Sequence, residues 1–375
     1  MARAESTRHR AIETCHKLNY LAVAHHVGPA KGENSMSIIP KRTLGRTGLE
    51  ISALGFGGAP LGDLFEEVSN ECAQSTLKAA WDAGIRYFDT SPYYGYGKSE
   101  HRLGYFLRSQ ERQEFALSTK VGRVFKAARD LKTFDKGGWV GGLPFTFHFD
   151  YSYDGIMRSW EDSLQRTGLN AVDLLLIHDL DSFFHDSEQR FSAYLNQLIT
   201  SGWRALDELR SQGLIKGIGA GLNRMGALPR LLDAVDLDFC IIAMPYTLLD
   251  QQVLDEEFPL CQERDVHIVI GAVFASGILV NGPVEGARYA YETASEEILE
   301  KTRRIEAVCQ RHAVPLPAAA MQFPLAHPLV TSIIPGAMAP EHIATNAGWF
   351  QHPIPTALWE ELKHEGLLRP DAPTP

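Results

Sequence analysis

The sequence has few cysteines, no long apolar run and fewer basic than acidic residues. Of its 375 residues five are cysteine, and 36 Lys and Arg stand against 46 Asp and Glu, which gives a net charge of −10. A surplus of acidic residues argues against nucleic-acid binding and against adhesion to an anionic membrane. No stretch approaches the roughly 18 apolar residues that cross a bilayer. We therefore expect no nucleic-acid partner and no membrane association.

The cysteines give no sign of a disulfide framework. They are odd in number and far apart in the sequence, and no CxxC motif occurs. This pattern is typical of reduced thiols, so we expect a cytoplasmic protein. The five positions are Cys15, Cys72, Cys240, Cys261 and Cys309.

Several well-known catalytic motifs are also missing. HExxH and GxSxG do not occur, and no His, Cys or Asp group has metal-ligand spacing. We therefore expect no metal site and no serine hydrolase. Gly217-Ile-Gly-Ala-Gly221 lacks the third glycine of a Rossmann fingerprint. Gly97-Lys-Ser99 lacks the first glycine of a phosphate loop, because Pro92 occupies that place.

The chain divides into a short first segment and one folded domain. Residues 1–35 carry scattered charge without a sustained period, and we expect a disordered extension there. Residues 36–375 are predicted to form the domain, in which a short apolar run, a loop and a helical period recur. The eight apolar runs are 52–56, 85–89, 115–120, 172–178, 215–220, 238–243, 267–272 and 329–334.

Eight strands that alternate with helices predict an α/β fold, a single (β/α)8 TIM barrel. One connection is much longer than the others, namely residues 121–150 after the third strand. Long loops in compact domains are usually functional, and we expect its Trp139, Phe145 and Phe147 to line a substrate pocket. The alternative is a small hydrophobic cluster beneath the loop.

Three successive strands end in polar side chains. The second strand ends at Asp89, the third at Lys120 and the fourth at His178, and Tyr94 follows Asp89 by five residues. In a TIM barrel the carboxyl ends of the strands form the active site. A charge directly after an apolar run is costly unless it is paired, so these side chains are expected to meet.

Together the four residues suggest a proton-transfer device. A lysine beside a tyrosine is expected to lower the phenol's pKa, and an aspartate keeps the lysine charged and in place. The histidine is expected to orient a substrate oxygen. Such a tyrosine exchanges a proton with a hydroxyl or carbonyl oxygen, and the natural companion step is hydride transfer to a nicotinamide.

The chain resembles the aldo/keto reductase family from Arg42 to about Gly348. The resemblance is carried by the segments 44–52 (LGRTGLEIS), 88–95 (FDTSPYYG), 99–100 (SE), 117–120 (LSTK), 172–178 (VDLLLIH) and 334–337 (IPGA). It implies a catalytic tetrad of Asp89, Tyr94, Lys120 and His178. It also implies NAD(P) bound across the barrel mouth without a metal.

Further segments resemble a narrower group of the family, which includes D-threo-aldose (L-fucose) 1-dehydrogenases and pyridoxal 4-dehydrogenases. These segments are 149–159, 219–223 and 246–250. The resemblance places cofactor contacts at Asn223, Phe274, Ser276, Gly277, Gly336, Ala337, His342 and Asn346. Family members that prefer NADP carry basic residues after the eighth strand. Gly336, Ala337, Met338 and His342 stand there in this chain, so we expect NAD rather than NADP.

The expected function is therefore NAD-dependent oxidation of an aldose hemiacetal of the L-fucose type to its lactone. Tyr94 is the expected base, and His178 also contacts the substrate. Three alternatives remain: a pyridoxal 4-dehydrogenase, an NADPH-dependent aldehyde or ketone reductase, and a cofactor-binding subunit without enzymatic activity. The sequence does not distinguish a monomer from a homo-oligomer.

Overall fold

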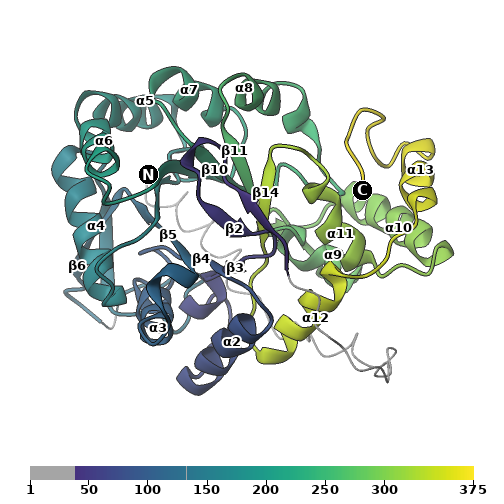
Figure 1. Cartoon of the computed structure of the whole chain (residues 1–375), viewed down its shortest axis with the longest axis horizontal. Helices are drawn as coiled ribbons and strands as arrows, with labels where there is room; N and C mark the ends of the chain where they lie inside the picture. Colours follow the sequence, from purple (N-terminus) through teal and green to yellow (C-terminus); the bar gives the residue numbers. More distant parts are fainter. Residues whose placement is uncertain (1–38, 132) are drawn as a thin grey trace.

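The computed structural model describes residues 39–131 and 133–375 (Figure 1). The expected disordered extension, residues 1–35, lies outside these residues. Within them, eight parallel strands form one sheet in the order β14-β11-β10-β9-β8-β5-β4-β3. Their bounds are β3 (Phe56–Gly57), β4 (Tyr87–Asp89), β5 (Ala116–Val121), β8 (Leu174–His178), β9 (Gly217–Leu222), β10 (Phe239–Ala243), β11 (His267–Gly271) and β14 (Val330–Ile334).

Two parallel bridges join the edges of this sheet. Leu54 pairs with Ile333 and Gly57 pairs with Gly336, which brings β3 beside β14 and closes the barrel. Helices surround it on the outside (Figure 1). They are α2 (Asn70–Asp82), α3 (Lys98–Leu107), α4 (Tyr153–Thr167), α5 (Glu188–Gln197), α6 (Trp203–Ser211), α7 (Ala227–Ala234), α8 (Glu257–Glu263), α9 (Ile278–Asn281), α10 (Glu296–Arg311), α11 (Leu316–Leu325), α12 (Pro340–Phe350) and α13 (Thr356–His364). The predicted (β/α)8 barrel is confirmed.

The strands are buried on both faces, which explains why they read as continuous apolar runs. One face packs against the helices in the larger core, to which Leu117, Leu175 and Ile177 belong. The other face fills the barrel with a smaller core that includes Leu174 and Leu176. Because side chains alternate along a strand, every second residue of a strand points into the barrel.

A β-hairpin covers the amino-terminal end of the barrel. It consists of β1 (Lys41–Thr43) and β2 (Glu50–Ser52), which pair antiparallel. Leu44 and Ile51 of this segment are fully buried in the same small core as the barrel interior. Figure 1 shows the hairpin lying across the barrel in the view along its axis. The sequence analysis treated 52–56 as one strand and did not predict the hairpin.

The long segment after β5 is not the irregular loop that we expected. It contains a second antiparallel hairpin, formed by β6 (Arg123–Ala127) and β7 (Phe145–Phe149). Phe145 and Phe147 alternate with polar residues, which is the period of a strand, so the pattern was present in the sequence. A third hairpin, β12 (Arg288–Tyr289) with β13 (Glu292–Thr293), follows α9.

Two expectations from composition can be compared with the described residues. No helix there is long and apolar enough to span a membrane. The cysteines at positions 72, 240, 261 and 309 are free thiols, and all but the first are buried.

Helix α3 contacts α4 through a glycine. A Cβ atom on Gly104 would lie 2.1 Å from the carbonyl oxygen of Thr167. We expect Gly104→Ala to lower the free energy of unfolding by about 1–3 kcal/mol, because the backbones must move apart. Gly348→Ala is the matched control: this exposed helical position has no atom near its Cβ, and the change should stabilise by up to about 1 kcal/mol. Urea denaturation measures both, and equal effects would contradict the prediction.

Candidate active site

Asp89, Lys120 and His178 occupy the last inward-facing positions of three neighbouring strands. The strand register places Asp89 opposite Ser118 and Lys120 opposite Leu176. Residues below them on the same face, such as Tyr87 and Leu174, fill the barrel. The three polar side chains therefore lie on the floor of the barrel mouth, and none is more than 6% exposed.

A buried ion pair joins the first two. The Lys120 ammonium donates to both carboxylate oxygens of Asp89, at 2.8 and 2.7 Å, and to the carbonyl oxygen of Thr90 at 2.8 Å. Ser118 donates a further hydrogen bond to Asp89. Burial raises the pKa of Asp89, while the charge of Lys120 opposes that rise. All three protons of the ammonium are thus used, two by Asp89 and one by Thr90.

Tyr94 lies on a tight loop above this pair. Gly95 adopts φ +66°, and a Cβ atom there would lie 2.4 Å from the carbonyl oxygen of Gly62. The backbone segments around Gly62 and Gly95 therefore cross without side chains between them. This crossing fixes the backbone that carries Tyr94. The Lys120 ammonium lies 4.7 Å from the centre of the Tyr94 ring. The His178 ring lies edge-on to it at 6.0 Å.

The electrostatics of Tyr94 differ from our expectation. Burial raises its pKa well above 10, and the charges of Asp89 and Asp179 raise the pKa further, while Arg123 opposes them. The expected lowering of this pKa by Lys120 is therefore wrong. The reason is that the Asp89 carboxylate cancels the lysine's charge, which leaves desolvation as the largest effect. The phenol is protonated at neutral pH.

His178 is held as a neutral ring. Its Nδ1 atom lies 3.0 Å from Nη1 of Arg123 and 3.1 Å from the hydroxyl of Ser91. Burial lowers the pKa of His178 well below 6.5, and the positive charges of Arg123 and Lys120 lower that pKa further. A neutral imidazole donates a hydrogen bond to a substrate oxygen but does not supply a proton at neutral pH.

The sequence analysis missed Arg123 and Asp179. Arg123 is buried, and Nη2 donates to Asp179 at 2.7 Å. Both residues lie close to segments already identified: Arg123 comes three residues after Lys120, and Asp179 directly follows His178. The sequence signal for Arg123 was a charged residue between Gly122 and the apolar pair Val124 and Phe125.

The predicted substrate wall is present in part. Trp139 is buried 5.6 Å from the Tyr94 ring, and Phe147 lies edge-on to Tyr93 at 5.4 Å. Both rings therefore reach the mouth of the barrel. Phe145 instead stacks on Phe125, farther along the hairpin. The structure does not bring Phe145 to the tetrad.

An ion-pair cluster anchors the segment that carries Trp139. Lys98 and Arg102 of α3 both contact the buried carboxylate of Asp63, at 2.5 and 2.6 Å. Lys98 also donates to the carbonyl oxygen of Gly141 at 2.8 Å. The long segment is thus fastened to α3 and to the loop after β3.

The predicted cofactor residues follow β9, β11 and β14. Asn223 donates its amide to Asp179 at 2.7 Å, which leaves the amide oxygen as an acceptor. Ser276 has φ +61° and Gly277 has φ +100°, and the Ser276 hydroxyl accepts from the backbone N–H of Tyr291 at 3.0 Å. Phe274 is different, because its ring is buried edge-on against Trp349 of α12.

The remaining residues surround the start of α12. Ala339 precedes this helix and offers no side chain to its first N–H groups, which therefore suit an anion. Asn346 and Ala337 are buried nearby, and a Cβ atom on Gly336 would lie 2.6 Å from Pro60. His342 is half-buried and accepts from the backbone of Met338.

Comparison with known proteins agrees with this geometry. The model of the aldo/keto reductase family matches residues 53–364. The chain belongs to the aldo/keto reductase family. Two relatives are a pyridoxal 4-dehydrogenase of Microbacterium luteolum, 45% identical over 88% of this chain and 98% of that protein, and a D-threo-aldose 1-dehydrogenase of a Pseudomonas species, 40% identical over 88% and 97%.

A solved structure supports the family fold. The holo form of aldo-keto reductase AKR11C1 from Bacillus halodurans is 26% identical and matches with a TM-score of 0.68, over 88% of this chain and 97% of that one. The family member described here is therefore an oxidoreductase, and its family uses the nicotinamide cofactors NAD or NADP. The alternative of a subunit without enzymatic activity is not supported.

The Asp89–Lys120 pair is expected to support both stability and turnover. Asp89→Asn leaves a buried ammonium without a countercharge, and we expect the free energy of unfolding to fall by about 3–5 kcal/mol. Asp173→Asn is the control at the other end of the barrel, because its partners Arg112 and Lys216 are partly exposed. We expect a smaller loss there, measured by urea denaturation at pH 7. Similar losses in both variants would contradict a special role for the buried pair.

Proposed function

We propose that this family member oxidises the hydroxyl-bearing carbon of a cyclic hemiacetal to a lactone, with NAD as the hydride acceptor. The observation that carries the proposal is the meeting of Tyr94, the Asp89–Lys120 pair and a neutral His178 at one barrel mouth. The names of the two dehydrogenase relatives support the direction of oxidation.

The chain's own groups have distinct tasks in this step. Tyr94 accepts the proton of the substrate hydroxyl when it is in its phenolate form, and the Nε2 proton of His178 hydrogen-bonds the same oxygen as it becomes a carbonyl. Lys120 and Asp89 form a fixed, charge-balanced pair beside the phenol ring. A bound nicotinamide supplies the acceptor for the hydride that leaves the carbon. Asn223 and the start of α12 would hold the two ends of that cofactor.

Two substrates share this chemistry. An aldose of the D-threo type is the first candidate, and L-fucose represents it. Pyridoxal is the second, since its aldehyde and neighbouring hydroxymethyl group also close to a cyclic hemiacetal. The aromatic rings of Trp139, Tyr93 and Phe147 beside the tetrad favour a flat aromatic substrate, which supports pyridoxal as a candidate.

Tyr94→Phe tests the assignment of the base. We expect the rate of NADH formation to fall by at least about 10²-fold, because the hydroxyl proton loses its acceptor. The panel is L-fucose, D-arabinose, L-galactose and pyridoxal, and the preferred substrate of the wild type identifies the class. Tyr105→Phe, at an exposed tyrosine, is the control. Turnover that survives in Tyr94→Phe removes the proposed role.

The raised pKa of Tyr94 predicts the pH dependence of the reaction. Because the fraction of phenolate grows as pH approaches that pKa, oxidation should accelerate from pH 7 to pH 10. Reduction of the product lactone by NADH uses the protonated phenol, whose fraction stays near one below that pKa, so its rate should change little over the same range. Initial rates in both directions measure this, and an oxidation rate that is flat with pH would contradict it.

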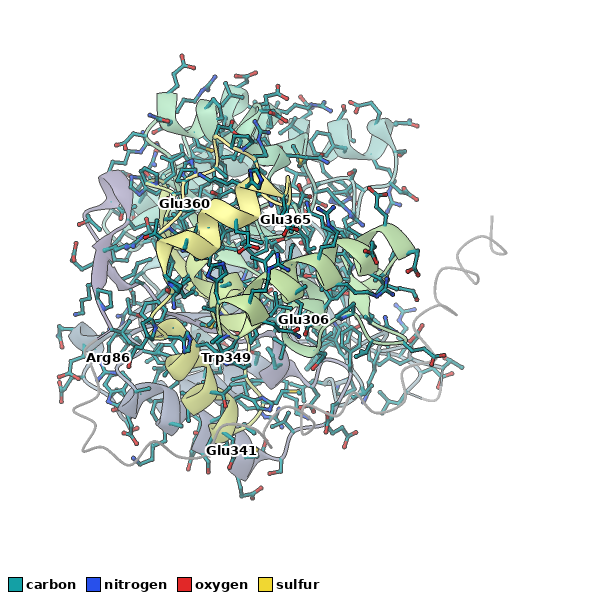
Figure 2. All side chains as sticks on the ribbon, turned by 90° about the vertical axis from the view of Figure 1, so that its right-hand side faces the viewer. Arg86, Glu306, Glu341, Trp349, Glu360 and Glu365 are labelled. Carbon is teal, nitrogen blue, oxygen red and sulfur yellow. The ribbon has the colours of Figure 1, made fainter. Side chains whose placement is uncertain are left out.

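The charge beside the helix start favours NAD over NADP. Burial lowers the pKa of His342, and the carboxylates of Glu66 and of Glu341 in the first turn of α12 oppose that lowering, so two carboxylates lie near this histidine. Figure 2 labels Glu341 at the start of its helix. Negative charge repels the extra phosphate of NADP. The alternative, an NADPH-dependent reductase, needs a basic partner for this phosphate, and none of residues 336–342 is Lys or Arg.

Glu341→Lys tests this preference. We expect the ratio of kcat/KM for NADP to that for NAD to rise about tenfold, equivalent to about 1.4 kcal/mol. Glu360→Lys makes the same change of charge on α13, at the exposed residue labelled in Figure 2, and should leave the ratio unchanged. Wild-type enzyme that prefers NADPH would instead support the reductase alternative.

A further inference from the structure

A buried guanidinium lies against the imidazole of the active site. Nη1 of Arg123 is 3.0 Å from Nδ1 of His178, and Nη2 donates to Asp179 at 2.7 Å. The Nε atom is buried and has no hydrogen-bond partner among the described residues. One arginine thus holds the histidine and the carboxylate next to it in the chain.

Aromatic rings hold this guanidinium in place. The centres of four rings lie between 4.3 and 5.1 Å from its central carbon. Two of these rings come from the β6–β7 hairpin, which also carries Arg123. The rings belong to Tyr93, Phe147, Phe149 and Phe184. Cation–π attraction on several sides restricts the guanidinium to one position.

The contact between Arg123 and Nδ1 of His178 determines which ring nitrogen carries the proton. An arginine guanidinium only donates hydrogen bonds and does not lose its proton in proteins. Nδ1 of His178 must therefore be the acceptor and carry no proton, which leaves the single ring proton on Nε2. The hydroxyl of Ser91, 3.1 Å from Nδ1, fits the same arrangement as a second donor.

We propose that Arg123 is a positioning residue that keeps His178 neutral and its proton on Nε2. His178 then offers one fixed hydrogen bond to the substrate oxygen and leaves the exchange of the substrate's proton to Tyr94. The effect on turnover rests on the proposed function, whereas the effect on the ring proton does not. Asp179 belongs to the same arrangement, because its carboxylate balances the charge of Arg123 beside an uncharged imidazole.

The other groups around the ring do not replace this role. Lys120 repels a proton from His178, as Arg123 does, but no hydrogen bond joins it to the ring. Nε2 of His178 lies 3.4 Å from Asp179, which favours a proton on Nε2. The titratable or charged side chains that face the ring are Tyr93, Tyr94, Lys120, Arg123 and Asp179.

The first measurement is made on folded protein labelled with ¹⁵N-histidine, without cofactor. Nitrogen shifts and couplings report the ring proton, and the His178 signals are those lost in His178→Gln. We expect a proton on Nε2 only, with no titration from pH 8 down to pH 5.5. A proton on Nδ1, or a titration midpoint near 6.5 in the wild type, would overturn the proposal.

The second measurement uses the double variant Arg123→Met/Asp179→Asn, which removes both charges and leaves no buried carboxylate unpaired. We expect the pKa of His178 to rise in this variant but to stay below 6.5, because burial and Lys120 still lower it, so kcat/KM for oxidation should fall as pH approaches 5.5. At pH 7 kcat should fall about tenfold to hundredfold. Arg123→Lys keeps a charged donor and should restore part of the loss. An unchanged ring proton and pH profile in the double variant would overturn the proposal.

Arg112→Met is the matched control. Arg112 also pairs with a buried aspartate, Asp173, at 2.7 Å and lies over the ring of Phe115, but at the amino-terminal end of the barrel. It should change neither the His178 signals nor the pH profile. If the wild type oxidises no panel substrate, the proposed function fails, and the nitrogen spectra still decide the role of Arg123. The wild-type spectrum also decides it if the double variant does not fold.

Discussion

The ion pair between Lys120 and Asp89 is the constraint around which the barrel mouth is built. Neither charge is stable in an apolar interior alone, so their presence at adjacent strand ends requires the two strands to pair in one register. That register also sets the height of His178 on the next strand. The pair costs desolvation energy, and it places a fixed and charge-balanced group beside the ring of Tyr94.

The backbone arrangement could be predicted from the sequence because the information was local and repeated. Each barrel strand is an apolar run of a length that suits a buried parallel sheet, and the helices between them follow a clear period. The meeting of Asp89, Lys120 and His178 could be predicted for the same reason, since strand ends are visible in the sequence and the carboxyl ends of parallel strands must meet. Helix starts are local in the same way: Ser295 precedes α10 and caps it, and Pro340 is the first residue of α12.

Features that depend on contacts distant in the sequence were not predicted. The pKa of Tyr94 is governed by burial and by Asp179, and neither follows from the spacing of four residues. The aromatic rings around Arg123 come from the loops after β4 and β8 and from a hairpin that we had treated as a loop. Phe274 was expected to contact the cofactor, and its ring packs against Trp349 of α12.

The complete use of the three ammonium protons of Lys120 has a chemical consequence for a member of the aldo/keto reductase family. Amines condense with aldehydes to form imines, but only through a free electron pair on nitrogen. The Lys120 nitrogen has no such pair while it donates to both oxygens of Asp89 and to Thr90. A reactive carbonyl can therefore sit beside this lysine at high concentration without becoming covalently trapped.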